Sequence, residues 1–382
     1  MNKPIIFNKP YITGNELKYV TEVTVSGKLS GGGKFTKWCT GFFEEKYNIK
    51  KAFLTTSCTD ALEMASLLLD IKPGDEVIAP AYTYVSTANA FVLRGAKILF
   101  ADSNPLNPNI DADSIEKLIS PRTKVIIAVH YAGIACDMDK IMGIAKAHNL
   151  YVVEDAAQAV DSYYKGKALG SIGHIGAISF HETKNVISGE GGLMTINDDQ
   201  FYKRAEIISE KGTNKSSFMR GEINNYEWVD IGSSFLASEI TAAFLRAQLE
   251  SMESIQKVRK KLWDLYYSEL NAAEKNGFLK RPFIPEYAEH NAHIFYIVLN
   301  SSKERMALIQ HLKSKNISAV FHFLSLNKSH FYKNQGTIDL TNSDRYTDCL
   351  LRLPMYYELT KEEIVYICEQ INSFFENNER LS

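Results

Sequence analysis

Two short apolar runs, each ending in polar and charged residues, constrain the fold of this chain more than any other feature. They are residues 151–158 (YVVEDAAQ) and residues 177–185 (AISFHETKN). The aliphatic and β-branched residues that begin each run predict a buried strand. Because ligands of open α/β sheets bind beyond the carboxyl ends of the strands, the polar side chains at both ends are expected to face one crevice. These side chains are Asp155, Gln158, Ser179 and Lys184.

A lysine and a carboxylate in one buried crevice indicate a ligand that uses both. Each is costly to bury unless something pairs with it. Pyridoxal phosphate (PLP) uses both, since its pyridinium nitrogen pairs with a carboxylate and its aldehyde forms a Schiff base with a lysine. Asp155 and Lys184 therefore predict a PLP site. A purely structural salt bridge between them is the alternative interpretation.

The rest of the chain predicts two domains. Apolar runs at 52–55, 76–79, 97–101 and 125–129 alternate with helical segments. This alternation is typical of a mostly parallel sheet covered by helices on both faces. A helical stretch over 235–270, with an expected break near Met252, leads into a region that mixes strands and helices. We expect a large α/β domain over 1–250, including the N-terminal segment, and a small α+β domain over 251–382.

Two local predictions concern less regular segments. Residues 212–226 are polar and rich in Gly and Asn, which predicts an ordered loop. Residues 319–323 (AVFHF) predict a strand of the C-terminal region.

Composition limits the classes of function. The chain has 382 residues, 45% hydrophobic and 23% charged, which is ordinary for a globular protein with a sizeable core. A net charge of −2 without a long basic run gives nucleic-acid binding no electrostatic support. The five cysteines form no CxxC pair, and the sequence pattern leads us to expect neither a signal peptide nor a membrane-spanning run. We therefore expect a cytoplasmic protein that binds neither nucleic acid nor membrane.

Two segments begin like known motifs and then depart from them. Residues 26–34 (SGKLSGGGK) do not have the spacing of a phosphate-binding loop, and Lys34 is followed by Phe35 where Ser or Thr is needed. A glycine-rich turn is the favoured interpretation. Residues 181–184 (HETK) begin like a zinc-binding HExxH, but Asn185 stands where the second histidine is required. We expect no metal site.

Residues 56–59 (TSCT) follow a predicted strand and open a helix. Ser57, with Asp60 three residues later, resembles a capping box. The free amides of a helix start also attract anions. A capped helix and a phosphate site that includes Cys58 and Thr59 are therefore both open interpretations.

Several of these motifs together resemble the DegT/StrS-type sugar-nucleotide aminotransferases. They are VVEDAAQ at 152–158, SFHETKN at 179–185 and SGEGG at 188–192, and the likeness extends from about Phe7 to about Tyr357. The resemblance is greatest to the members that form dTDP-4-amino-4,6-dideoxygalactose. It implies the aspartate aminotransferase-like fold of PLP enzymes (fold type I). It also implies transfer of an amino group from L-glutamate to a dTDP-4-keto-6-deoxyhexose, for a lipopolysaccharide O-antigen, enterobacterial common antigen or similar surface polysaccharide.

The resemblance further implies roles for individual residues. Lys184 would hold the cofactor and move the proton, and Asp155 would pair with the ring nitrogen. The other expected cofactor contacts are Ser57, Cys58, Thr59 and Ser179 at the phosphate, Gln158 at the ring hydroxyl and Tyr84 stacked on the ring. The expected substrate contacts are His181, His322 and Asn327. The resemblance also raises the possibility that residues 26–34 border the active site.

A homodimer with shared active sites is also implied. Residues 212–234 are long enough to reach a neighbouring subunit, although a lid over the chain's own site is the alternative. Where many members have Gly-Tyr-Asn, this chain has Gly-Ser-Ser at 232–234, so Ser234 is expected to replace the asparagine that contacts the neighbour's cofactor phosphate. Residues 321–327 (FHFLSLN) depart from a family segment that ends Pro-Leu-His, at Ser325 and Asn327.

Other functions remain open on sequence grounds. Dehydratases of this fold replace the lysine with histidine, so Lys184 argues against that reaction. An aminotransferase for a different keto sugar nucleotide, or with other stereochemistry, is an alternative. A catalytically inactive ligand-binding regulator is the alternative outside the enzymes, and the presence of both Asp155 and Lys184 disfavours it.

Overall fold

The centre of the molecule is a seven-stranded sheet. The computed structural model describes residues 3–332 and 340–379. The strands are β1 (Lys51–Thr55), β2 (Glu76–Pro80), β3 (Lys97–Ala101), β4 (Thr123–Val129), β5 (Tyr151–Asp155), β8 (Ile175–Ser179) and β9 (Gly192–Ile196). They lie in the order β1-β9-β8-β5-β4-β2-β3, and β9 is antiparallel to both of its neighbours while the other pairs are parallel. The predicted mostly parallel α/β sheet is confirmed.

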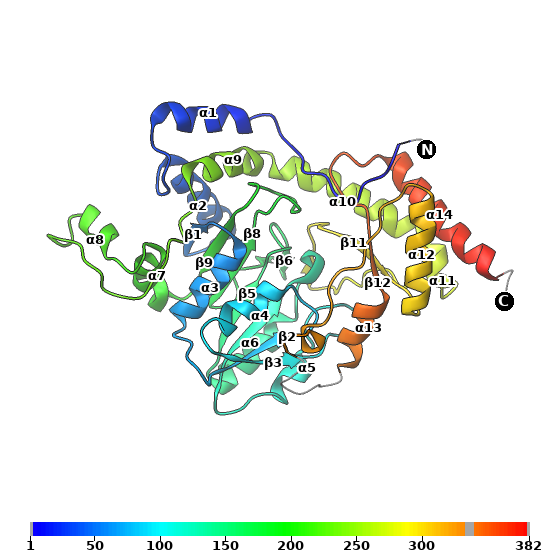
Figure 1. The fold of residues 1–382 in the computed structure, drawn as a ribbon, viewed down its shortest axis with the longest axis horizontal. Helices are drawn as coiled ribbons and strands as arrows, with labels where there is room; N and C mark the ends of the chain where they lie inside the picture. Colours follow the sequence, from blue (N-terminus) through cyan, green and yellow to red (C-terminus); the bar gives the residue numbers. More distant parts are fainter. Residues whose placement is uncertain (1–2, 333–339, 380–382) are drawn as a thin grey trace.

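Helices cover both faces of this sheet (Figure 1). Side chains alternate along a strand, so Val152 and Val153 on β5 enter different hydrophobic clusters. The cluster that contains Val152 includes α2 (Lys34–Tyr47), α6 (Met138–His148) and α9 (Glu239–Glu250). The cluster that contains Val153 includes α3 (Cys58–Leu68), α4 (Val85–Val92) and α7 (Tyr202–Ser209). The result is a three-layer α/β/α arrangement.

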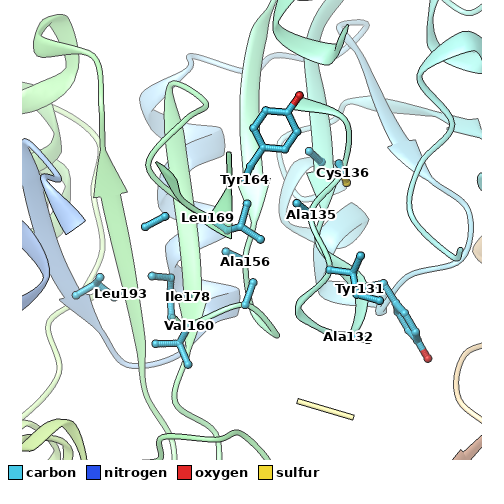
Figure 2. Packing of buried hydrophobic residues seen from close by; sticks show 14 of the residues in the cluster. Tyr131, Ala132, Ala135, Cys136, Ala156, Val160, Tyr164, Leu169, Ile178 and Leu193 are labelled. Atoms are coloured by element: carbon cyan, nitrogen blue, oxygen red, sulfur yellow. The ribbon is translucent and has the colours of Figure 1, made fainter. Parts of the chain in front are cut away.

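Figure 2 shows part of the first cluster. Ile178 and Leu193 pair across β8 and β9, and Ala156, Val160 and Leu169 belong to the same buried cluster. Full burial of an aliphatic side chain of the size of isoleucine or leucine stabilises a fold by about 1.5–3 kcal/mol. This packing fixes β5 and β8 next to each other, and with them the two motif-bearing strand ends.

In the C-terminal region, helices pack around the two-stranded sheet β11-β12 and form a separate hydrophobic cluster. Its elements are α10 (Met252–Glu269), α11 (Asn271–Lys275), β11 (Phe295–Val298), α12 (Ser302–Ser314), α13 (Thr341–Cys349), β12 (Leu350–Leu353) and α14 (Lys361–Glu379). Ser251 separates α9 from α10, which confirms the break expected near Met252. Ile5 pairs with Ile317, so the start of the chain also packs in this region (Figure 1). The division into 1–250 and 251–382 remains our proposal.

The remaining elements are short or lie outside the two sheets named so far. They are α1 (Glu16–Ser26), α5 (Ala112–Glu116), β6 (Tyr163–Tyr164), β7 (Lys167–Ala168), α8 (Lys215–Met219), β10 (Ala288–Glu289) and the 3-10 turns η1 (Tyr131–Gly133), η2 (Asp199–Phe201) and η3 (Leu326–Lys328). None of the helices within the described ranges has the combined length and apolar character that crossing a membrane requires.

Two local predictions were wrong. The segment 212–226 contains the helix α8, because Phe218 packs on Tyr226 with ring centroids 5.6 Å apart and Arg220 forms ion pairs with neighbouring glutamates. The segment 319–323 forms only one bridge, from Val320 to Arg352, instead of a strand. Beyond that bridge the chain turns so that His322 faces a cavity, which ends the ladder.

The glycine-rich segment 26–34 leads into α2, and a carboxylate of the chain itself occupies the start of that helix. Glu239 accepts from the backbone amides of Gly33 (2.9 Å), Phe35 (2.9 Å) and Thr36 (3.0 Å). Helix N-termini attract anions, and here the anion is internal. Glu239 therefore caps α2, and none of residues 26–34 lines the cavity described next.

Candidate active site

A cavity of about 620 Å³ lies at the carboxyl ends of three parallel strands. Val129, Asp155 and Ser179 end β4, β5 and β8, and all three line it. The opposite wall comes from the C-terminal region and includes His322 and Arg352. The cavity is thus where the sequence predicted a crevice.

Lys184 lines this cavity from the loop between β8 and β9. Its amide donates to the carbonyl of His181 (2.9 Å), which forms a tight turn. The next residue, Asn185, is anchored by hydrogen bonds to Gln256 (2.8 Å) and His293 (3.0 Å) of the C-terminal region. Burial lowers the pKa of the Lys184 amine. A lysine that loses its proton more readily is a better nucleophile towards a carbonyl carbon.

The two carboxylates at the end of β5 have opposite environments. Glu154 is fully buried and accepts from the amides of Gly170 (2.8 Å), Ile172 (2.7 Å) and Gly173 (2.6 Å). It also pairs with Nε2 of His130 at 2.9 Å. Its acceptor positions are therefore used within the protein.

Asp155, one residue further, points to the other face of the sheet and lines the cavity. Its Oδ2 accepts from Oγ1 of Thr87 at 2.7 Å, and its Oδ1 accepts from the amide of Ala157 at 3.2 Å. A carboxylate has about four acceptor positions, so Asp155 keeps capacity for a ligand. Thr87 was missed at the sequence level, since no pattern in its helix α4 marks it.

The turn at 56–59 is a cap, and it also leaves backbone amides available to an anion. Ser57 accepts from the amide of Asp60 at 3.0 Å, which confirms the predicted cap. The first turn of a helix also leaves amides without intrahelical partners, and those of Cys58 and Thr59 belong to this turn. All three predicted residues of the turn line the cavity, as does Ser179.

Glycine at position 192 allows β9 to pass beneath this turn. A Cβ atom there would lie 2.4 Å from the amide nitrogen of Cys58 and from the carbonyl oxygen of Ser57. Contacts under 3.0 Å do not occur for real Cβ atoms, so any larger residue would displace the turn. The SGEGG motif thus positions the anion site.

Gln158 and Tyr84 also line the cavity. The side-chain oxygen of Gln158 accepts from the amide of Ala132 at 2.7 Å, which fixes the side-chain amide in place. Tyr84 precedes α4 and is 60% exposed, so its ring has an open face. Tyr82 is only 1% exposed and is a core residue.

The predicted substrate residues divide into two groups. His181 and His322 line the cavity, and Nδ1 of His322 lies 2.7 Å from the hydroxyl of Tyr131. Asn327 is buried in η3 and is not among the cavity-lining residues. Ser234 is exposed and likewise lies outside the cavity of its own chain.

The C-terminal wall contains two residues that sequence reasoning did not single out, His293 and Arg352. His293 hydrogen-bonds Asn185, next to Lys184, and burial keeps its pKa well below the usual value. Arg352 lies on β12, within the sequence LLRLP at 350–354. The sequence could have drawn attention to Arg352, because it is the single charged residue of an apolar strand. The pattern does not indicate, however, which face of the strand carries its side chain.

The residues of the sheet wall fit PLP. An amine at Lys184, a carboxylate with free acceptor capacity at Asp155 and free amides at 58–59 are the three groups that PLP requires of its protein. The side chains of Gln158 and Tyr84 lie in the same cavity and can contact the ring.

Comparison with known proteins identifies the family. The model of the DegT/DnrJ/EryC1/StrS aminotransferase family matches residues 10–372. The spore coat polysaccharide biosynthesis protein SpsC of Bacillus subtilis is 33% identical over 379 residues, covering 96% of this chain and 95% of SpsC. GDP-perosamine synthase of Escherichia coli O157:H7 is 32% identical over 374 residues, covering 96% and 97%.

A solved structure agrees with this result. The PLP form of a proposed sugar aminotransferase of Streptococcus pneumoniae superposes with a TM-score of 0.89 at 29% identity, covering 98% of this chain and 99% of that one. The fold and the site define a PLP-dependent aminotransferase of fold type I. The chain belongs to the DegT/DnrJ/EryC1/StrS aminotransferase family. It is a sugar aminotransferase that uses PLP.

Proposed function

We propose that this enzyme transfers the amino group of L-glutamate to carbon 4 of a dTDP-4-keto-6-deoxyhexose in the cytoplasm, giving dTDP-4-amino-4,6-dideoxygalactose for a surface polysaccharide. The observation that carries the chemistry is that Lys184 and Asp155 line one cavity at neighbouring strand ends. A relative named for polysaccharide biosynthesis supports the sugar class. The choice of a dTDP sugar depends on the resemblance at 152–158, 179–185 and 188–192.

In this proposal the sheet wall binds the cofactor. Lys184 would hold it covalently, Asp155 would accept a hydrogen bond from the ring nitrogen, and Gln158 would contact the ring hydroxyl. The phosphate contacts are Ser57, Cys58, Thr59 and Ser179. The open face of Tyr84 stacks on the ring.

The bound cofactor supplies an electron sink for the charge that develops when a proton leaves the carbon bearing the amino group. With the amine substrate bound, Nζ of Lys184 would be free to take the proton from that carbon. Nζ later delivers a proton to the sugar carbon that receives the amino group. The lowered pKa of Lys184 favours the proton-accepting form. His181 and His322 contact the substrate, and Asn327, which is buried and does not line the cavity, acts indirectly.

The working unit in this proposal is a homodimer whose sites use both chains. Ser234 lies outside the cavity of its own chain, and the segment that carries it projects from the body at α8 (Figure 1). Met219 and Trp228 of the same segment are 73% and 81% exposed, which is unusual for large apolar side chains without a partner. We assign Ser234 to the cofactor phosphate of the neighbour.

Mixing two inactive variants tests the shared site. Lys184→Ala removes the amine, and Ser234→Asp places a negative charge where a phosphate is proposed. A mixed dimer would contain one site with both native residues and would recover activity. Absence of recovery, with subunit exchange demonstrated by mass-tagged chains, would show that each chain builds its site alone.

The substrate is tested with a panel. The purified, PLP-loaded enzyme is given L-glutamate and either dTDP-4-keto-6-deoxyglucose or GDP-4-keto-6-deoxymannose. We expect kcat/KM to favour the dTDP sugar by at least about tenfold, a factor that corresponds to about 1.4 kcal/mol. Mass spectrometry and NMR of the product report the carbon aminated and its stereochemistry. A preference for the GDP sugar would contradict the assignment and favour the activity for which the E. coli relative is named.

A further inference from the structure

His293 joins the C-terminal wall of the cavity to the loop that carries Lys184. It precedes β11, lines the cavity and is only 6% exposed. Its Nδ1 lies 3.0 Å from Oδ1 of Asn185, the residue that follows Lys184. An asparagine can present either its oxygen or its NH₂ group to a neighbour. The orientation of the Asn185 amide therefore decides which nitrogen of His293 carries the proton.

The other partners of Asn185 fix that orientation. Its Nδ2 donates to the backbone carbonyl of Asn291 (2.8 Å) and to Oε1 of Gln256 (2.8 Å). A backbone carbonyl can only accept, so the NH₂ group of Asn185 must lie on this side. Gln256 in turn donates through Nε2 to the carbonyl of Val160 at 3.3 Å, which keeps its oxygen towards Asn185. The atom of Asn185 that faces His293 is therefore the oxygen, which can only accept.

The imidazole of His293 is neutral and carries its proton on Nδ1. Burial lowers its pKa well below the usual value, and the charges of Lys184, Arg259 and Arg352 lower it further. A neutral imidazole has one N–H group, and the oxygen of Asn185 requires that group at Nδ1. Nε2 makes no hydrogen bond with any residue that the structure describes. Nε2 of His293 thus offers a lone pair to a ligand of the cavity.

The second buried histidine of this wall has no such constraint. Nδ1 of His322 lies 2.7 Å from the hydroxyl of Tyr131, and a hydroxyl can donate or accept. The proton of His322 can therefore be on either nitrogen. In contrast, the network behind His293 allows one tautomer only, and that tautomer makes Nε2 an acceptor.

We propose that Nε2 of His293 accepts a hydrogen bond from the hydroxyl group on carbon 3 of the keto sugar, and that Asn185 positions the imidazole for this contact. His293 is then a specificity-determining residue, and Asn185 is a positioning residue. This inference rests on the proposed function, in which a 4-keto-6-deoxyhexose receives the amino group.

A hydroxyl group fits this acceptor better than an ammonium group does. The donors that the two substrates bring into the cavity are the hydroxyl groups of the sugar and the ammonium group of L-glutamate. Lys184, Arg259 and Arg352 are close enough for their charges to act on His293. These charges repel a second cation and leave a neutral hydroxyl unaffected.

The neighbourhood of Lys184 selects the hydroxyl on carbon 3. In the proposed function Lys184 delivers a proton to carbon 4, and His293 is held by the residue next to Lys184. The two ring neighbours of carbon 4 differ in a 4-keto-6-deoxyhexose. Carbon 3 carries a hydroxyl, whereas carbon 5 carries the methyl group and is bonded to the ring oxygen, neither of which can donate. The hydroxyl on carbon 3 is therefore the donor nearest to the reacting carbon.

Removal of that hydroxyl from the substrate tests the contact. The dTDP-4-keto-6-deoxy sugar is compared with its 3-deoxy analogue. The variants are His293→Leu, which has no acceptor, and His293→Gln, whose side-chain oxygen can replace Nε2. The matched control is His290→Gln, because His290 belongs to the same segment and does not line the cavity.

The expected result is a loss that depends on the hydroxyl. In the wild type, kcat/KM should be about 30-fold higher for the hydroxylated sugar than for the deoxy analogue. His293→Leu should lose about 30-fold with the hydroxylated sugar and less than about threefold with the analogue, because a residual acceptor is needed only for the hydroxyl. His293→Gln should restore part of the loss, and His290→Gln should behave like the wild type.

Two outcomes would overturn the proposal. The half-reaction with L-glutamate, followed by absorbance of the bound cofactor, should change less than about threefold in every variant. A loss there as large as in the sugar half-reaction would assign Nε2 to the amino donor. Equal losses with the hydroxylated and the deoxy sugar would show that His293 has a structural role only.

The tautomer is tested without turnover. Nitrogen–hydrogen correlation spectra of the PLP-loaded enzyme with isotope-labelled histidine distinguish a proton on Nδ1 from one on Nε2. The signals of His293 are assigned by their absence in His293→Gln. We expect the proton on Nδ1. A proton on Nε2 would make that atom a donor and would overturn the inference.

Failure of the proposed sugar would not be confused with failure of this inference. If the wild type prefers GDP-4-keto-6-deoxymannose, the same comparison is made with that sugar and its 3-deoxy form. A preference for the GDP sugar alone would overturn the choice of nucleotide and leave the role of His293 supported by its dependence on the hydroxyl. Absence of a preference for the hydroxyl in both nucleotide series would overturn the role of His293.

Discussion

The two walls of the cavity are built differently. On the sheet wall, the protein already hydrogen-bonds the groups that face the cavity: Asp155 accepts from Thr87, Gln158 from Ala132 and Ser57 from Asp60. On the C-terminal wall, Arg352 has no acceptor among the described residues. The sheet wall is therefore preorganised for one fixed ligand, whereas the other wall leaves a charge for a ligand that enters and leaves.

The difference agrees with the chemistry of a two-substrate aminotransferase. A cofactor that stays bound is positioned best by side chains that cannot rotate. The substrates alternate in one site, so the groups that recognise them are completed only when each substrate is present. Changes on the sheet wall should therefore alter the chemistry for every substrate, and changes on the C-terminal wall should alter one half-reaction.

The largest effect is expected for Lys184→Ala. Without the amine, both half-reactions lose the group proposed to move the proton, and rates should fall by about 10⁴-fold. Borohydride reduction of the wild type followed by peptide mapping should label Lys184. The variant should still bind PLP through Asp155 and the turn at 57–59. A label on another lysine would remove Lys184 from the sheet-wall assignment.

Asp155→Asn should have the next largest effect. The side chains are nearly isosteric, so the fold should persist, but the charge proposed to keep the ring nitrogen protonated is lost. Loss of such an electrostatic contact costs about 2.7–4 kcal/mol in the transition state, which is about 10²–10³-fold in rate. Stopped-flow measurement of both half-reactions checks that they fall together. Activity near that of the wild type would show that the sheet wall does not tune the cofactor.

Glu154→Gln should instead affect stability. Both oxygens of Glu154 accept hydrogen bonds from N–H groups. In Glu154→Gln one oxygen is replaced by an NH₂ group, which cannot accept, so at least one buried N–H group loses its acceptor. The expected cost in the free energy of unfolding is about 2 kcal/mol. Thermal unfolding measures this loss, and turnover at 25 °C should stay close to that of the wild type. A large fall in turnover with unchanged stability would contradict the separation between the two carboxylates of β5.

The pH dependence of that stability follows from the paired groups. Burial disfavours the charged form of both side chains. The interaction with His130 outweighs the effect of burial on Glu154 and lowers the pKa of that carboxyl. Interactions with Cys136 and Glu154 outweigh the effect of burial on His130 and raise its pKa to about 10. The contribution of Glu154 is lost as pH falls below about 4.3, its unfolded value, and that of His130 declines as pH rises from about 6.5 towards 10. The difference between wild type and Glu154→Gln should be largest near pH 5–6.

The sheet wall could be predicted from the sequence because its residues lie at fixed offsets within strand patterns. Apolar runs located β3 and β5, and the polar ends of β5 and β8 placed Asp155 and Lys184 together. The identity of the neighbour that holds Asp155 could not be predicted, because Thr87 is brought to it by the packing of α4.

The C-terminal wall could not be predicted in the same way. The orientation of Arg352 depends on its pairing with Tyr296 and Val320 and on its contact with Phe7, which are distant in sequence. For the same reason the strand predicted at 319–323 was wrong, since tertiary contacts turn the chain towards the cavity. The helix α8 depends on the packing of Phe218 on a residue eight positions later, which composition does not reveal.

The smallest effect is expected for Ser234→Ala, which tests whether a neighbouring chain adds a third wall. Loss of one hydroxyl contact to a phosphate should weaken PLP binding by about fivefold, which corresponds to about 1 kcal/mol. Ser233→Ala is the matched control. Ser233 is also exposed, and the hydrogen bond that it accepts from the amide of Lys211 (3.0 Å) goes to its backbone carbonyl, which alanine keeps. Fluorescence titration of the apoenzyme with PLP measures both. If the two variants bind PLP equally, Ser234 makes no contact with the phosphate, and the cofactor site consists of the sheet wall of one chain.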